Sequence, residues 1–139
     1  MQSLMLQPVI ALVLWSFVMW AWLYATRIPA VLKYKVVMTP HQPAAEFHAQ
    51  LPAEVRWKAD NYNNLMEQPT LFYAVAITLA VIGEANTANL TLAWLYVGLR
   101  VVHSFVQATM NVIIVRFSVF MIASVVLLAL TIRAALAAF

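Results

Sequence analysis

The sequence predicts an all-α integral membrane protein folded as a bundle of four transmembrane helices. Of the 139 residues, 65% are apolar and only 9% are charged, whereas roughly 25% of the residues are charged in an average soluble domain. A soluble domain of this size cannot bury so many apolar side chains. Because one helical span needs about 20 apolar residues, the chain has room for four spans and one polar connection.

Composition also excludes several kinds of site. The chain has no cysteine, so it has no disulfide, no thiolate metal site and no thiol nucleophile of its own. Its three histidines are scattered, so we predict no metal site. Only two glycines occur, which excludes a glycine-rich phosphate loop. The low charge and high apolar content further exclude a soluble enzyme, a disordered chain and a nucleic-acid partner.

The first span is predicted over residues 8–31. Pro8 suits a first helical turn, and the following residues up to Ala25 are almost wholly apolar. A cleaved signal peptide is not favoured, because no Lys or Arg precedes the apolar run.

A polar region follows, since residues 32–68 hold eight of the thirteen charged residues. Pro40, Pro43 and Pro52 break any helix in its first half, so residues 32–53 are predicted to form a loop. A helical pattern then covers residues 54–83, polar at first and apolar later, and ends at Gly83. Pro69 is expected to kink this second span without ending it.

The remaining chain predicts two further spans, over residues 90–110 and 112–138, within one domain that covers residues 1–139. The orientation follows from basic residues. The connection between spans 1 and 2 and the turn between spans 3 and 4 carry Lys33, Lys35, Arg56, Lys58 and Arg116. The positive-inside rule places both connections in the cytoplasm and both termini outside, and Arg133 can reach the outer interface by snorkelling.

Two polar stripes interrupt the predicted spans, where ionisable groups are costly and commonly functional. The first comprises Arg56, Asp60, Asn64 and Glu67, which share one helix face. Its alternative interpretation is a solvated face with ion pairs between successive turns.

The second stripe comprises Arg100, His103, Ser104, Gln107 and Asn111, again on one face of a helix. Its alternative interpretation is a polar contact surface that joins helices, with Arg100 in a structural ion pair with Glu67. For Ser104 and Gln107 we prefer this structural role. For His103 we prefer a structural hydrogen bond.

Arg116 begins the last span, where it either sets topology or lies beside a bound anion. Together these residues suit a small zwitterionic ligand. Arginine binds carboxylates through a bidentate fork, Glu67 can hold an ammonium group, and an arginine beside a thiol lowers a pKa that starts at about 8.5. Glutathione meets each requirement, as do other amino-acid-like ligands.

The run from Arg56 to Phe72, with Asn64, Glu67 and Pro69, resembles the second-helix signature of the MAPEG family, the membrane-associated proteins in eicosanoid and glutathione metabolism. The run Arg100-Val-Val-His103-Ser104, with Arg116 sixteen residues after Arg100, is similar to that family's third-to-fourth helix segment. The resemblance covers most of the chain.

This resemblance implies a homotrimer of four-helix bundles that binds glutathione between subunits, open to the cytosol. Arg116 would activate the thiol. The residues implied to bind the rest of glutathione are Arg56, Asn64, Glu67, Arg100, His103 and Gln107. The implied function is a glutathione-dependent transferase or peroxidase that acts on lipophilic electrophiles or hydroperoxides drawn from membrane lipid.

Three positions depart from the family pattern. Asp60 occupies a position where the family usually has an arginine, so Arg56 or Lys58 would have to supply that positive charge. Gln107 occupies the position of a frequent tyrosine, and Phe117 that of a serine. These departures resemble a bacterial, functionally unassigned branch, which implies a bacterial inner membrane. They also keep open an alternative, a non-catalytic trimeric membrane protein that binds a lipid or a small anion. A transporter is less favoured, because no inverted repeat is visible.

Overall fold

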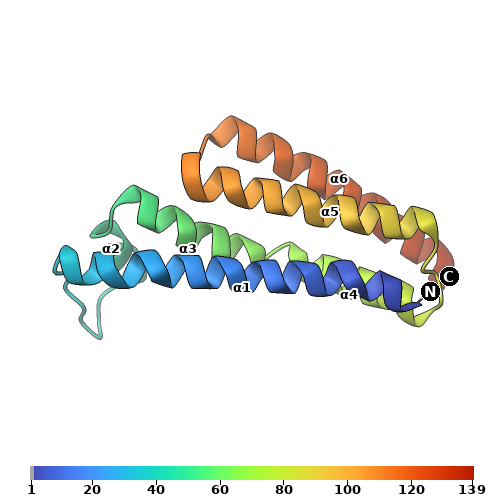
Figure 1. The fold of residues 1–139 in the computed structure, drawn as a ribbon, viewed down its shortest axis with the longest axis horizontal. Coiled ribbons are helices and arrows are strands. Elements are labelled where there is room, and N and C mark those ends of the chain that lie inside the picture. The colour runs from blue at the N-terminus through green and yellow to red at the C-terminus, as the bar shows by residue number, and fades with distance from the viewer. Residues whose placement is uncertain (1) are drawn as a thin grey trace.

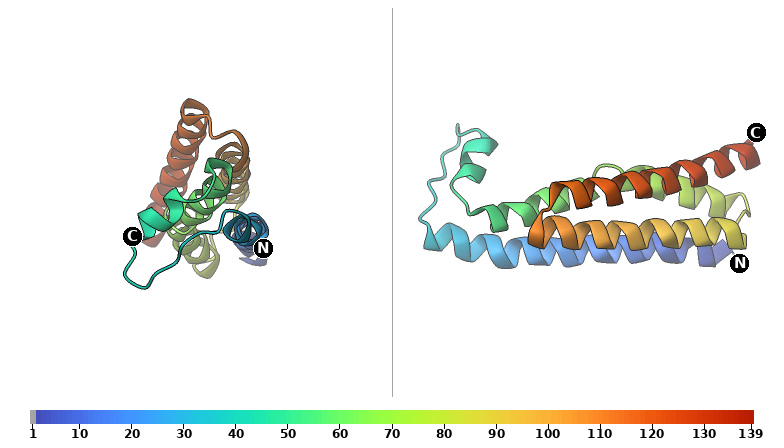
Figure 2. Two further views of the ribbon diagram at one scale, coloured as in Figure 1. Left: turned by 90° about the vertical axis from the view of Figure 1, so that its left-hand side faces the viewer. Right: turned by 90° about the horizontal axis from the view of Figure 1, so that it is seen from above.

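In the computed structural model, residues 2–139 are described, and all their regular structure is helical. The elements are α1 (Gln2–Lys33), α2 (Ala44–Ala49), α3 (Ala53–Leu65), α4 (Pro69–Val81), α5 (Thr87–Phe105), η1 (Val106–Met110) and α6 (Ile113–Ala138). Helix α1 lies along α3 and α4, and α5 and α6 form an antiparallel hairpin beside them (Figures 1 and 2). The two ends of the described chain lie at the same end of this elongated bundle.

Helix α1 is longer than the predicted span 8–31, because it already begins at Gln2. Met5 is fully buried in the core, so packing extends the helix toward the N-terminus. Pro8 therefore lies inside the helix and not in its first turn, and Pro29 lies inside it as well. Prolines are tolerated at such positions in apolar helices when neighbouring groups satisfy the freed carbonyls.

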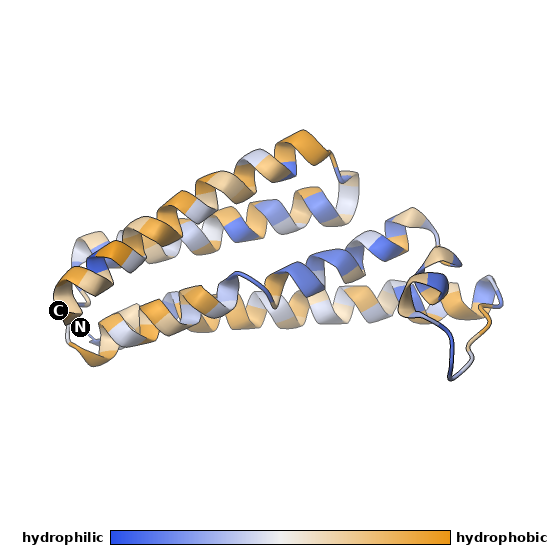
Figure 3. Ribbon diagram, turned by 180° about the vertical axis from the view of Figure 1, so that it is seen from behind, coloured by the Kyte–Doolittle hydropathy of each residue, from blue (hydrophilic) through white to orange (hydrophobic). Residues whose placement is uncertain are grey.

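The second predicted span is two helices, which corrects the expectation that Pro69 would only kink it. Helix α3 ends at Leu65, and Pro69 occupies the first turn of α4. Because Pro69 has no N–H, it cannot donate the helical bond to Leu65. The N–H groups of Met66 and Glu67 instead bond to the carbonyls of Asn63 and Asn64, at 3.0 and 3.2 Å. This interruption separates the polar α3 from the apolar α4 (Figure 3).

The predicted loop 32–53 contains a helix that the prolines did not prevent. Helix α2 begins directly after Pro43, whose fixed backbone suits the residue before a helix. The Gln50 side chain accepts a bond from the Val37 N–H at 2.9 Å and donates to the Val37 carbonyl at 3.0 Å. Ala30, Val36 and Leu51 form a small buried cluster beneath this loop. The connection is therefore packed against the end of α1.

The third helical segment does not end as a regular α-helix at residue 110, where the predicted span 90–110 ends. Its α-helix stops at Phe105, and Val106–Met110 form one wider π turn closed by a 2.6 Å bond from the Asn111 N–H to the Val106 carbonyl. Asn111 then adopts a left-handed conformation (φ 48°, ψ 36°), which asparagine tolerates better than most residues. Helix α6 follows and covers nearly all of the segment 112–138.

By length and composition, two helices can cross a membrane, α1 and α6. Among residues 2–139 no other helix meets that criterion. Helix α4 has 13 residues, about 20 Å, which is shorter than the roughly 30 Å hydrocarbon core. The sequence-based prediction of an all-α fold is confirmed.

Candidate functional site

Arg116 lies where two polar cavities adjoin, at the end of the bundle opposite the chain termini. The π turn and the left-handed Asn111 reverse the chain between α5 and α6, so that Arg116 stands in the first turn of α6. Its Nη1 donates to Asn111 Oδ1 at 2.8 Å. The guanidinium is therefore oriented by the same residue that makes the turn.

The inner cavity has a volume of about 230 Å³ and lies between α3, α5 and the start of α6. It brings together four of the predicted site residues with three apolar ones, which sequence reasoning did not place there. The lining residues are Asn64, His103, Gln107, Ile113, Arg116, Phe117 and Phe120. No carboxylate among the described residues lines it, so its net character is cationic.

The outer cavity has a volume of about 390 Å³ and lies between α2, α3 and the turn before α6. Its polar lining residues are His48, Arg56, Trp57, Asp60, Asn111 and Arg116. The first predicted stripe is thus divided, because Arg56 and Asp60 face the outer cavity and Asn64 the inner one. The Nε of Arg56 is buried and has no hydrogen-bond partner.

Arg100 is fully buried behind the inner cavity. Its Nη2 donates to the Asn64 side-chain oxygen and, at 3.3 Å, to the Asn64 carbonyl. Its guanidinium also lies over the Phe120 ring, 5.6 Å from the centroid. Nε and Nη1 have no partner. No carboxylate bonds to Arg100 among the described residues, and Glu67 attracts it only from a distance. Burying a charge without a directly bonded counter-charge costs several kcal/mol.

Among residues 2–139, Arg100 bonds directly to Asn64 and not to Glu67. Glu67 still attracts the Arg100 charge from a longer distance, so the alternative interpretation holds only as a long-range interaction. Glu67 lies in the interruption between α3 and α4, so it no longer continues the helical stripe of Asn64. Its side chain is exposed and lines neither polar cavity. The interruption at Pro69 is the physical reason for this departure.

His103 and Gln107 are both buried and line the inner cavity. The His103 Nδ1 and the Gln107 Oε1 have no hydrogen-bond partner within the described chain. The structural hydrogen bond expected for His103 is therefore not made through Nδ1. Two buried polar atoms beside the cavity thus keep unused hydrogen-bonding capacity.

Ser104 has a structural role, as its alternative interpretation predicted. The Trp15 indole donates to the Ser104 hydroxyl at 3.0 Å and so joins α1 to α5. The Trp15 ring also packs against Phe105 at 5.2 Å. Ser104 lines neither polar cavity.

Gln68 positions the interruption, and sequence reasoning missed it. Its Oε1 accepts from the Tyr96 hydroxyl at 3.1 Å, and its Nε2 donates to the Ser124 hydroxyl at 2.8 Å. Tyr96 in turn stacks on Phe72, with centroids 4.7 Å apart. The partners of Gln68 are distant in sequence, so no local spacing signal could have found them.

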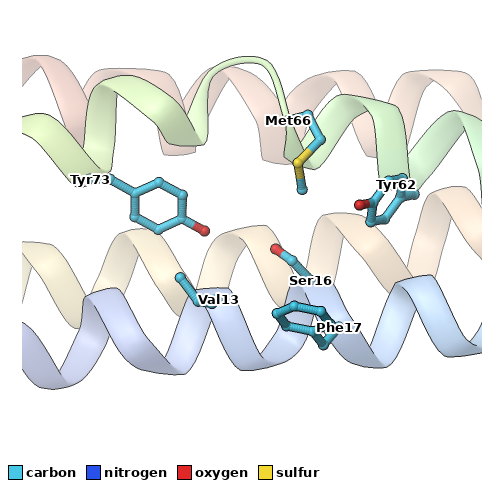
Figure 4. Close-up of a pocket in the computed structure, with 6 residues that line it drawn as sticks. All are labelled: Val13, Ser16, Phe17, Tyr62, Met66 and Tyr73. Atoms are coloured by element: carbon cyan, nitrogen blue, oxygen red, sulfur yellow. The ribbon is translucent and has the colours of Figure 1, made fainter.

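A third cavity of about 240 Å³ lies between α1 and the α3–α4 interruption (Figure 4). Its lining residues are Val13, Ser16, Phe17, Tyr62, Met66 and Tyr73. None of them is charged, so this cavity does not suit the carboxylates of the predicted ligand. Within residues 2–139, no group of His, Asp or Glu side chains is suited to hold a metal ion.

Comparison with known proteins gives one match. The family model described as "MAPEG family" matches residues 5–136. No curated protein and no solved structure matches the chain. The matched range includes both polar cavities, the interruption at Pro69 and the turn at Asn111.

Proposed function

The chain belongs to the MAPEG family, and on that premise we propose that it is a membrane-bound, glutathione-dependent transferase or peroxidase. Its substrates in this proposal are lipophilic electrophiles or hydroperoxides. The observation that carries the proposal is Arg116, which lines two adjoining polar cavities while Arg100, to which no carboxylate bonds, lies buried behind one of them. A cationic cavity of this kind favours a bound anion.

The donor set around the two cavities fits glutathione as a substrate. Arg56 has an unpartnered Nε for a carboxylate, and Asp60 supplies a carboxylate for the ammonium group. Asp60 therefore takes the role that the sequence suggested for Glu67. The amide of Asn64, held by Arg100, lines the inner cavity together with Arg116 and can position the peptide.

Arg116 would favour the thiolate form of glutathione, because a nearby cation lowers a thiol pKa from about 8.5. In the transferase reaction the thiolate sulfur attacks the electrophilic carbon, a carbon–sulfur bond forms, and the leaving group departs as an anion. In the peroxidase reaction the thiolate sulfur attacks the terminal oxygen of the hydroperoxide, the O–O bond breaks, and the alkoxide leaves and takes up a proton to become the alcohol. The thiol of a second glutathione then attacks the sulfenic acid sulfur, which gives the disulfide and water. Ile113, Phe117 and Phe120 supply an apolar wall for the lipophilic substrate.

The proposal includes an assembly and a location. The protein is a homotrimer of four-span bundles in a bacterial inner membrane, with glutathione bound between subunits near the cytoplasmic face. Two features support this arrangement. Large apolar side chains are exposed along α1 and α6, as expected for surfaces that meet lipid or another subunit. Lys33, Lys35, Arg56, Lys58 and Arg116 all lie in or beside the connections at the end of the bundle opposite the termini.

Turnover by the purified protein tests this function. We expect conjugation of chlorodinitrobenzene or reduction of cumene hydroperoxide with glutathione, and a fall of about 100-fold in kcat for Arg116→Ala. Lys33→Ala removes an exposed cation of the same charge outside both cavities and should leave turnover unchanged. The enzyme proposal fails if the wild-type protein has no turnover, or if the kcat of Arg116→Ala equals that of the wild type.

A non-catalytic binding protein is the second candidate, and the exposed position of Glu67 favours it, because the family signature then lacks a carboxylate in the cavity. Calorimetry with glutathione, or with a lipid or small anion, distinguishes the two. Ligand binding that depends on Arg116 without any turnover supports this second candidate over the enzyme.

A further inference from the structure

A fourth cavity, which is also polar, lies at the end of the bundle that carries the chain termini, far from Arg116. It has a volume of about 240 Å³ and lies between the α4–α5 turn and the last turns of α6. Its lining residues are Glu84, Asn89, Arg133, Leu136 and Ala137. The volume corresponds to on the order of eight water molecules, which is the size of a small charged headgroup.

The two opposite charges at this cavity are held apart by asparagines. Arg133 Nε donates to the Asn89 side-chain oxygen, and Asn86 Nδ2 donates to Glu84 Oε2 at 3.1 Å. Within residues 2–139, Glu84 and Arg133 bond to these asparagines and not to each other. The cavity thus presents a cation and an anion side by side, each oriented and each still able to bind a ligand.

The orientation of Arg133 suits a phosphate group. Asn89 is almost fully buried and is anchored by its own Nδ2 bond to the Glu84 carbonyl at 2.8 Å. Asn89 accepts the bond from Nε, so the edge of the guanidinium formed by the two terminal nitrogens of Arg133 is left for a ligand. Nη2 makes only a long bond of 3.4 Å to Asn86, and Nη1 has no partner among the described residues. That edge can donate hydrogen bonds to two phosphate oxygens at once.

An apolar stripe continues from the cavity along α6. Val125, Leu128, Ile132 and Leu136 follow one another at helical spacing and are 63%, 58%, 50% and 79% exposed. Alkyl chains can lie along this stripe while a headgroup occupies the cavity. In a membrane-associated family, a polar cavity at a bundle end with an apolar stripe leading from it fits a lipid better than a soluble metabolite.

We propose that this cavity binds the headgroup of a phospholipid that carries a primary ammonium group, of the phosphatidylethanolamine class. The phosphate bonds to Arg133, the ammonium group bonds to Glu84, and the acyl chains lie along α6. Glu84 disfavours phosphatidylglycerol, which has a phosphate but no ammonium group. Phosphatidylcholine is also disfavoured, because its quaternary ammonium has no N–H to donate to Glu84.

Native mass spectrometry of the detergent-purified full chain tests the proposal with dioleoyl phosphatidylethanolamine, phosphatidylcholine and phosphatidylglycerol. We expect wild type to retain the ethanolamine lipid about fivefold more than the other two, as for a partly exposed charge pair. Arg133→Gln should lower retention of both the ethanolamine and the glycerol lipid. Glu84→Gln should abolish the preference for ethanolamine but keep phosphate binding. This second variant tests the proposal if Arg133→Gln does not fold.

The matched control is Lys33→Gln, which removes one exposed positive charge at the other end of the bundle and should leave the lipid preference unchanged. Equal retention of all three lipids by wild type would overturn the proposal, as would an ethanolamine preference that survives Glu84→Gln. Competition by chain-free glycerophosphoethanolamine at the same concentration as the lipid would overturn the assignment to a lipid.

Discussion

Arg100 shows at the scale of one residue how a buried charge can serve ligand binding at the expense of stability. Its guanidinium is fully buried, contacts Asn64 and the Phe120 ring, and forms no bond to a carboxylate among the described residues. Replacing buried ions by apolar residues of similar volume is often neutral or stabilising. We therefore attribute the presence of Arg100, which lowers the stability of the ligand-free protein, to its attraction for an anionic ligand.

We therefore predict that Arg100→Met leaves the melting temperature of the ligand-free protein unchanged or raised. The same variant should bind glutathione roughly tenfold more weakly, a change of about 1.4 kcal/mol. Thermal melting in detergent, with and without glutathione, measures both quantities. A ligand-free variant destabilised by more than about 2 kcal/mol would instead assign Arg100 a structural role, because the bond to Asn64 would then be the dominant contribution.

Asn111 joins a backbone requirement to a side-chain role, and two substitutions separate them. Its φ of 48° suits glycine, whereas alanine at this position is strained by about 1 kcal/mol. Its side chain accepts the bond from Arg116. We predict that Asn111→Gly keeps the turn and the stability but lowers kcat with little change in KM, since Arg116 loses its fixed orientation.

Asn111→Ala should lower both stability and kcat. Steady-state kinetics and thermal melting of the two variants provide the comparison. Wild-type kcat in Asn111→Gly would show that the bond from Asn111 does not orient Arg116 for the reaction.

The interruption between α3 and α4 is the element that determines how the site differs from its prediction. Asn64 stays on α3 beside Arg100, whereas Glu67 moves into the turn and becomes exposed. Gln68 fixes this turn through Tyr96 and Ser124, which belong to α5 and α6. Pro69 thus interrupts the helix, and the Gln68 side chain holds the resulting separation of the two signature residues in place.

We predict that Gln68→Ala destabilises the protein by about 1–2 kcal/mol, because two hydrogen bonds between helices are lost. Gln7→Ala, an exposed glutamine on α1, is the matched control and should have little effect. Denaturation monitored by circular dichroism compares the two. If both variants unfold alike, the amide of Gln68 does not hold the interruption.

The elements show where sequence reasoning was sufficient. Apolar runs located α1, α4, α5 and α6, because burial in lipid or in a core determines local composition. The prolines misled the prediction at α2, which lies in the predicted loop, and at Pro69, which ends one helix and starts another. The π turn after Phe105 could not be predicted, since a single wider turn leaves no periodic signal. The contact of Arg100 with Asn64 and the bonds of Gln68 could not be predicted either, because they depend on how distant helices pack.

At the scale of the whole molecule, the proposal of four spans makes a topological prediction. Both ends of the described chain and the α4–α5 turn lie at one end of the bundle, and the loop before α3 lies at the other (Figure 1). A cysteine introduced at Thr87 should therefore react with an impermeant maleimide from the outside of intact cells. A cysteine at His41 should react only in inverted vesicles.

The chain has no native cysteine, so this labelling has no background from the protein itself. Both positions are exposed, so access to the reagent depends on the side of the membrane. Reaction of both from the same side would contradict the proposed arrangement of spans.

Helix α1 has 32 residues, a length of about 48 Å, while a bilayer offers about 30 Å of hydrocarbon. Its two charged residues, Arg27 and Lys33, lie near its C-terminal end, where Arg27 lies over the Phe47 ring at 5.7 Å. Lys58 of α3 lies over the Trp22 ring at 5.3 Å. In the proposed membrane arrangement, the excess length of α1 places α2 and α3 at the boundary between hydrocarbon and water. A reaction at that boundary takes one reactant from each phase, so the partition coefficient of the lipophilic reactant sets how much of it the protein meets.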